Sequence, residues 1–173
     1  MRWGWLLALA LMGCAPTWDW RELPLASGAV TARFACKPVS QMRELPWLDA
    51  GKPLPTTLWA CEHGGVTQAV VLADVGDPAR VGLTLRAWRE ATLANLAAQG
   101  PSERGAWAVP RATPQPEAGR WAFTGRRSDG AALHVQTALA SRGTWVIQAT
   151  LVGAEALPPA VAQAFFEGVA FGQ

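Results

Sequence analysis

The fold is decided by residues 56–88, which read TTLWACEHGGVTQAVVLADVGDPARVGLTLRAW. Two runs rich in apolar and β-branched residues, 56–63 and 66–74, flank Gly64-Gly65, a pair suited to the two-residue turns that require positive φ. These residues predict a β-hairpin. Asp77 then supplies a helix N-cap and Pro78 a first helical residue, so a helix is expected directly after the hairpin.

This helix is predicted to run to about Gln99 and to end at Gly100-Pro101. Its apolar residues recur at spacings of three and four, which places them on one stripe. The residues of the stripe are Val81, Leu85, Trp88, Thr92 and Leu96. A stripe of this kind packs against a core, so we interpret the tryptophan as a core residue rather than as part of a ligand site.

The C-terminal third predicts a meander of three strands, at 120–127, 131–140 and 144–152. Apolar residues alternate along each run and the connections are short, which requires antiparallel pairing. A further short strand is expected at 106–109. A final short helix is expected over 158–168, with apolar residues on one face.

Upstream of the hairpin, residues 28–36 alternate between apolar and polar and predict a half-buried strand. Residues 37–55 contain four prolines, a density that favours a long irregular loop. Helices packed on a mainly antiparallel sheet give an α+β fold class. We expect residues 28–173 to form one such domain.

The N-terminus has the features of a secretory signal. Arg2 gives it a positive start, and residues 3–11 form an apolar run that is too short to span a bilayer as a helix. The following Leu11-Met12-Gly13-Cys14 resembles the bacterial lipobox, which implies removal of residues 1–13 and diacylation of Cys14. The alternative is an apolar N-terminus that contains an incidental cysteine.

Ala15 follows the lipobox cysteine, where Asp would retain a lipoprotein at the inner membrane, so we expect an outer-membrane location facing the periplasm. Residues 14–27 are then a lipidated tether. Its pair Trp18 and Trp20 either lies at the lipid interface or caps the core of the domain. The expected partners are the membrane, through the anchor, and an envelope protein or lipid.

Cys36 and Cys61 remain once Cys14 is acylated. An even pair in an oxidising compartment, outside any CxxC or Cys/His cluster, favours a disulfide that ties down the proline-rich loop. Cys61 shares a strand face with Trp59, and Cys36 lies on the apolar face of its own strand, so the sulfurs meet if both faces cover one core. Two buried free thiols are the alternative.

The layout resembles the PsbP-like α-β-α sandwich family, which includes DcrB-like bacterial lipoproteins. The resemblance lies in residues 30–34 followed by Pro38, in the hairpin 59–74 leading into a long helix, and in 144–153 running into 164–168. It covers most of residues 28–171 and implies an accessory binding role. The proline-rich loop with its cysteine pair departs from the family pattern, and no metal or partner site is carried over from the family.

The sequence offers little catalytic chemistry. It contains no GxSxG, HExxH, Walker A or GxGxxG motif, and its carboxylates are scattered. His63, beside the Gly64-Gly65 turn, should be exposed, and His134 lies on the more polar face of its strand with Gln136. The net charge of +2, or +1 without the signal that carries Arg2, shows no basic cluster for nucleic acid.

We therefore expect no catalytic residue, no cofactor and no metal, and a non-catalytic envelope module that binds a protein, peptide or lipid. A periplasmic hydrolase whose site is assembled only by folding is the alternative, and a purely structural accessory of an envelope complex is a third. A cleft that brings His63 or His134 against a buried carboxylate would favour the hydrolase.

Overall fold

The computed structural model describes residues 18–45 and 53–172, so the predicted signal peptide and Cys14 lie outside the described residues. The described chain is built on one antiparallel sheet of seven strands. In spatial order these strands are β3 (Val39–Leu45), β4 (Leu54–His63), β5 (Val66–Asp74), β9 (Trp145–Gly153), β8 (Ala132–Arg142), β7 (Gly119–Arg126) and β6 (Gln99–Gly105).

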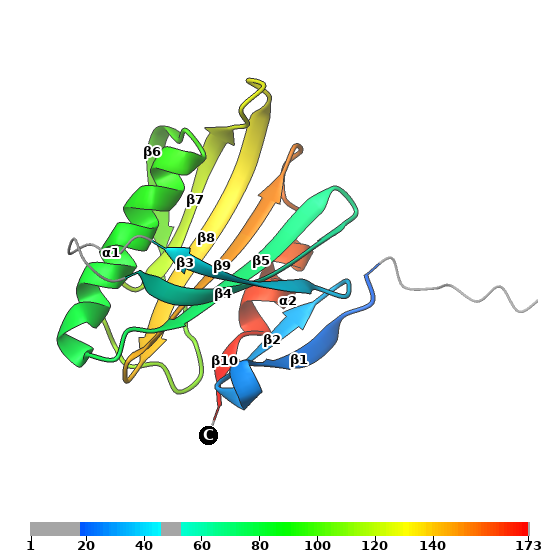
Figure 1. Cartoon of the computed structure of the whole chain (residues 1–173). Coiled ribbons are helices and arrows are strands. Elements are labelled where there is room, and N and C mark those ends of the chain that lie inside the picture. The colour runs from blue at the N-terminus through cyan, green and yellow to red at the C-terminus, as the bar shows by residue number, and fades with distance from the viewer. Residues whose placement is uncertain (1–17, 46–52, 173) are drawn as a thin grey trace, which may run out of the picture.

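Helix α1 (Pro78–Asn95) covers one face of this sheet, as Figure 1 shows. The opposite face carries the short helix α2 (Pro159–Glu167) and a second sheet of three strands. That sheet has the order β1 (Arg21–Leu25), β2 (Val30–Phe34) and β10 (Ala170–Phe171). The predicted α+β class with a mainly antiparallel sheet, a long helix and a short C-terminal helix is confirmed.

The hairpin and the long helix form where the sequence predicts them. Gly64 and Gly65 have φ of 58° and 72°, the positive values that the turn needs. The side chain of Asp77 accepts a hydrogen bond of 2.9 Å from the Ala79 amide and caps α1. The stripe residues Val81, Leu85 and Trp88 are buried, and the helix ends at Asn95, a turn earlier than predicted.

The three-strand meander is confirmed as β7, β8 and β9, but the strand expected at 106–109 is wrong. The strand at this edge is β6, at Gln99–Gly105, which pairs with β7 through a register shift between Gln99 and Glu103. Gly100-Pro101 lies inside that shift. Proline and glycine are tolerated at an irregular edge, although they rule out a regular central strand.

The prediction of an irregular loop over 37–55 is wrong for 39–45 and 54–55, which are strand, and residues 46–52 lie outside the described residues. Residues Val39–Leu45 form β3, which pairs with β4 in continuous register from Val39↔Ala60 to Leu45↔Leu54. Proline occurs on either side of this run, at Pro38 and Pro46, and does not interrupt it. The strand is exposed over almost its whole length, so its sequence carries no alternation that could reveal it.

Part of the predicted tether belongs to the folded domain, because Arg21–Leu25 form β1 and pair with β2. A 3₁₀ turn at Ala26–Gly28 with positive φ joins the two strands. Trp18 and Trp20 are half-buried against the core on this face of the sheet, which favours the interpretation that they cap the core. Among the described residues, no helix is long and apolar enough to cross a membrane.

Candidate functional site

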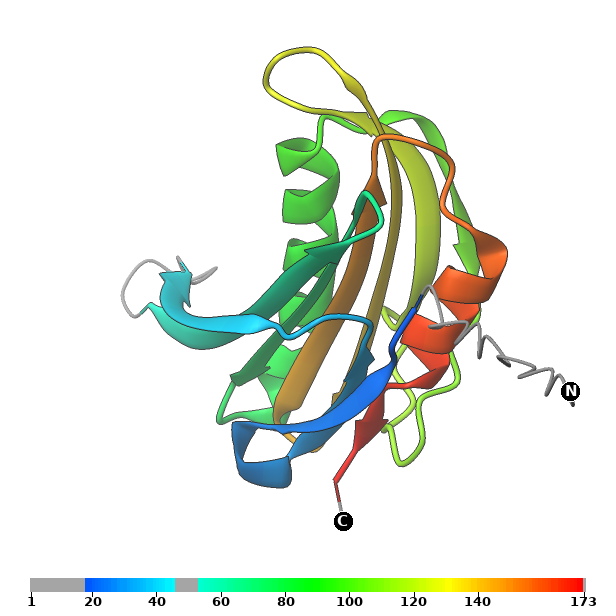
Figure 2. The same ribbon diagram turned by 90° about the vertical axis from the view of Figure 1, so that its right-hand side faces the viewer.

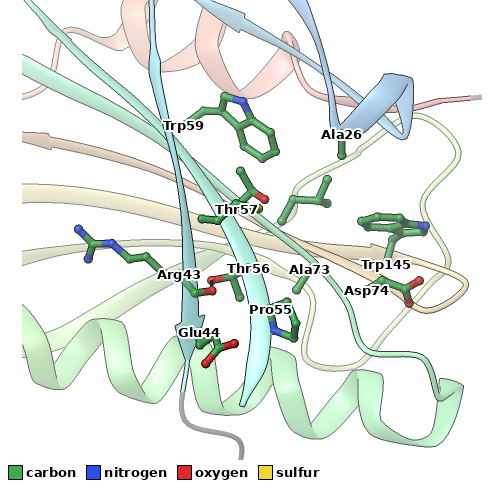
Figure 3. Close-up of a pocket in the computed structure, with 12 residues that line it drawn as sticks. Ala26, Arg43, Glu44, Pro55, Thr56, Thr57, Trp59, Ala73, Asp74 and Trp145 are labelled. Atoms are coloured by element: carbon green, nitrogen blue, oxygen red, sulfur yellow. Dashed lines mark hydrogen bonds between the residues drawn. The ribbon is translucent and has the colours of Figure 1, made fainter. Parts of the chain in front are cut away.

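A groove of about 480 Å³ opens on the α2 face of the sheet, beside strand β3. Figure 3 shows it between the β3–β4 edge and the 3₁₀ turn that follows β1. We call it the edge groove. Its lining residues are Ala26, Met42, Arg43, Glu44, Pro55, Thr56, Thr57, Trp59, Leu72, Ala73, Asp74 and Trp145.

The strand alternation explains which side chains line the edge groove. Thr57 lies opposite both Met42 of β3 and Leu72 of β5, so these three side chains share one face of the sheet. Asp74 pairs with Trp145 of β9 and extends the same face toward the end of the sheet. The floor is therefore set by the register of four neighbouring strands.

The space remains open because the second sheet covers only part of this face. Figure 2 shows β3 and β4 curving away from β1 and β2, and the groove lining includes residues of β3 and β4 and Ala26 in the turn after β1. Trp59 and Trp145 are half-buried, packing against the core while lining the groove. The result is an apolar hollow with two indoles in its wall.

Two carboxylates, those of Glu44 and Asp74, lie at the edge groove and are exposed. One oxygen of Asp74 accepts a hydrogen bond of 2.9 Å from the Gly76 amide. Arg43 also lines the groove, and its guanidinium donates to Oε1 of Gln41 on its own strand. Figure 3 shows this side chain pointing away from the two indoles. The groove lining therefore carries two carboxylates and one guanidinium, a net negative charge.

Strand β3 forms an open edge beside the groove. Among the described strands it pairs with β4 alone, so the main-chain groups on its outer side face away from the sheet. Val39 and Met42 are 76% and 85% exposed, unusual values for large apolar side chains. Sequence analysis missed this surface, although the exposed apolar residues between Pro38 and Pro46 were its signal.

The two predicted disulfide residues meet in the structure. Cys36 and Cys61 have Cα atoms 6.0 Å apart and sulfurs at bonding distance, a geometry compatible with a disulfide. The pair joins the segment just before β3 to the far half of β4. It therefore fastens the start of the open edge to the sheet.

Neither predicted histidine lines the edge groove. The ring of His63 meets Trp18 edge-on, with centroids 5.0 Å apart, and is half-buried rather than fully exposed. His134 lines a separate, more polar hollow with Thr124 and Gln136. In residues 18–45 and 53–172 every carboxylate is at least partly exposed, so neither histidine meets a buried one.

A group of arginines surrounds Glu117 on the opposite half of the molecule. Arg86 and Arg89 donate to its two oxygens at 2.8 and 3.2 Å, and Arg89 and Arg104 lie over the Trp121 ring. The hydrogen bond from Arg86 lowers the pKa of Glu117 and raises the pKa of Arg86. These contacts fasten the segment before β7 to α1.

Within the described ranges, no group of three or more histidine, cysteine and acidic side chains lies close enough together to hold a metal ion. Comparison of the chain with protein-family models, curated proteins and solved structures found no match. The PsbP-like resemblance and the lipobox therefore stay predictions.

Proposed function

We propose that this protein is a lipid-anchored envelope lipoprotein whose domain binds a partner protein through the edge groove, without catalysis and without a cofactor. The observation that carries the proposal is the groove itself. It combines an apolar wall with two indoles, exposed carboxylates and an unpaired strand edge. Apolar concave surfaces with a few polar groups at their rim are typical of binding sites.

The position of the predicted anchor agrees with this role. Cys14 precedes Trp18 by four residues, which span at most about 14 Å when extended. Trp18 packs against Gly64, so the anchor would hold the turn end of β4 and β5 near the bilayer. Thr57 lies seven residues along β4 from that turn, about 23 Å, which leaves the groove accessible to a periplasmic partner.

The alternative of a periplasmic hydrolase has less support. Hydrolysis by a histidine base needs that base within hydrogen-bond reach of a nucleophile or an orienting carboxylate. Within the described residues, His134 lies in a hollow whose one carboxylate, Glu103, is exposed on β6. We therefore propose binding rather than catalysis.

The anchor is tested by replacing Cys14 with Ser and fractionating the cells. The wild-type chain should sediment with membranes and begin at an acylated Cys14 by mass spectrometry, whereas Cys14→Ser should be released. A variant that stays with the membrane, with a chain that begins at Met1, would remove the lipoprotein part of the proposal.

The groove is tested with a matched pair of threonine substitutions. Thr57→Trp fills the edge groove, and Thr124→Trp puts the same side chain into the hollow beside His134. Both variants, checked for folding by circular dichroism, are compared with wild type in complementing a deletion strain and in crosslinking to envelope proteins. The proposal is supported if Thr57→Trp alone loses complementation and crosslinking. If Thr124→Trp alone loses them, the function would be assigned to the hollow beside His134.

A further inference from the structure

We infer that the partner of the edge groove is an extended protein segment, apolar and basic, which adds to the sheet as a strand beside β3. This inference rests on the proposed function and specifies its ligand. It is carried by three features that meet at one place: a long open strand edge, an apolar groove beside that edge, and negative charge on the groove.

The main chain of β3 is suited to pairing. Its seven residues keep a continuous register with β4, so the strand is regular over about 23 Å. Natural proteins usually blunt exposed edges by shortening, bulging or covering them, because an open edge recruits other strands. An added strand obtains its affinity from main-chain hydrogen bonds and its specificity from the pockets that receive alternate side chains.

The groove provides those pockets. Met42 and Glu44 are two residues apart, so both project to the groove side of β3, where Met42 lies beside Thr57. A strand placed alongside β3 would send every second side chain over this face. Apolar side chains there would contact Met42 and Trp59, both of which line the groove.

The charge of the groove selects basic side chains. Glu44 and Asp74 are exposed carboxylates at the groove, and the one guanidinium in its lining, that of Arg43, is held on Gln41. A lysine or arginine that enters the groove would also come near the indoles of Trp59 and Trp145, and indole rings attract cations. An acidic segment would be repelled by the two carboxylates.

A second copy of this chain fits the site less well. Two β3 strands paired about a dyad at Met42 would place only Ser40, Met42 and Glu44 of the second copy over the groove face, and none of these residues is basic. A peptide that fills the groove as well as pairing with the edge uses the whole surface.

The test uses the purified full chain in detergent and a fluorescent peptide as long as β3, with both valine and lysine on each face of the strand. Binding is followed by anisotropy, against the same peptide with glutamate in place of lysine. We expect the basic peptide to bind about tenfold more tightly, because it gains attraction at two carboxylates where the acidic one is repelled. In the double variant Glu44→Lys with Asp74→Lys the preference should reverse.

Main-chain pairing is tested with two further basic peptides, N-methylated at odd or at even residues. Successive amides of a strand point to opposite edges, so only one of the two should bind if one edge pairs with β3. The inference would be overturned if both N-methylated peptides bound equally well, if the double variant kept the preference for the basic peptide, or if the basic peptide did not bind. It would also be overturned if the protein sedimented as a dimer that Met42→Lys dissociates. The proposed function is judged separately, by Thr57→Trp.

Discussion

The two edges of the seven-stranded sheet are built differently. At one edge, β6 is irregular: its register with β7 shifts between Gln99 and Glu103, and Gly100-Pro101 lies within the shift. Arg104 of β6 donates to the carbonyls of Pro116 and Ala118 at 2.7 and 3.0 Å, which fastens this strand to the neighbouring segment. At the other edge, β3 is regular and exposed, with apolar side chains facing solvent.

The two edges differ in how well they resist pairing with another strand. A bulge, a proline and tied charges are devices that keep an edge from recruiting another strand, and β6 has all three. The β3 edge has the charges of Arg43 and Glu44 but keeps its regular register and its exposed Val39 and Met42. The edge at β6 is therefore closed to further strand pairing, whereas the edge at β3 is the one at which we propose that a partner binds.

If the core beneath α1 provides most of the stability, substitutions in the buried stripe of this helix should cause the largest loss in the free energy of unfolding. Leu85 has no exposed surface, so Leu85→Ala should lower the free energy of unfolding by about 4 kcal/mol. Leu83→Ala on the same helix is the matched control: Leu83 is 53% exposed, and its loss should stay below about 0.5 kcal/mol. Urea unfolding measures both. If both variants lost the same free energy of unfolding, the buried stripe of α1 would not pack in the core as described.

The next largest effect on the free energy of unfolding should come from the Cys36–Cys61 disulfide, which fastens the start of β3 to β4. Replacing Cys36 and Cys61 by Ala should cost roughly 3 kcal/mol on the chain-entropy model, since the pair is separated by 25 residues. Wild-type protein in reductant should unfold at the same urea concentration as the double variant. Thiol counting on denatured, unreduced protein lacking Cys14 provides the check, and two free thiols per chain would show that the bond does not form.

A smaller effect, dependent on pH, is expected near β6. Glu117→Gln removes the partner of Arg86 and Arg89, and the half-exposed Arg86 limits the loss to about 1 kcal/mol at most. Because the hydrogen bond from Arg86 lowers the folded-state pKa of Glu117, the carboxylate stabilises the fold above its unfolded pKa, about 4.3. That contribution is lost as the pH falls through the folded pKa.

Unfolding of wild type and Glu117→Gln at pH 7 and pH 3 measures this contribution. The difference between the two proteins should be present at pH 7 and should shrink at pH 3. Glu90→Gln, which changes an exposed glutamate on the helix that carries Arg86 and Arg89, is the matched control and should show little difference at either pH. A difference that grows on acidification would contradict the stated role of Glu117.

The same contrast explains which elements the sequence predicts. The hairpin and the meander bury one or both faces, so their apolar residues alternate visibly, and the α1 stripe is periodic for the same reason. All three elements were predicted. The Cys36–Cys61 pairing followed from the faces of two such strands, and its geometry is confirmed.

Edge strands carry no such pattern. β3 is exposed, β6 contains glycine and proline, and β1 has an interior proline, Pro24. Each exists because a neighbouring strand pairs with its main chain, and local sequence does not encode that neighbour. The edge groove was missed for this reason, since Met42 and Trp145 come together only through the order of the strands.

The smallest effect on stability, and the most direct test of the comparison, comes from placing one lysine on each edge. Met42 and Glu103 are both exposed, so Met42→Lys on β3 and Glu103→Lys on β6 should each change the free energy of unfolding by less than about 0.5 kcal/mol. Their effects on recognition should differ. A lysine at position 42 puts a positive charge beside the groove and removes the apolar contact, so binding of the basic peptide and capture of the partner should fall several-fold. A lysine at position 103 should leave both unchanged. If the two variants bind equally well, the β3 edge is not the recognition surface, and its regular, exposed strand would need another explanation.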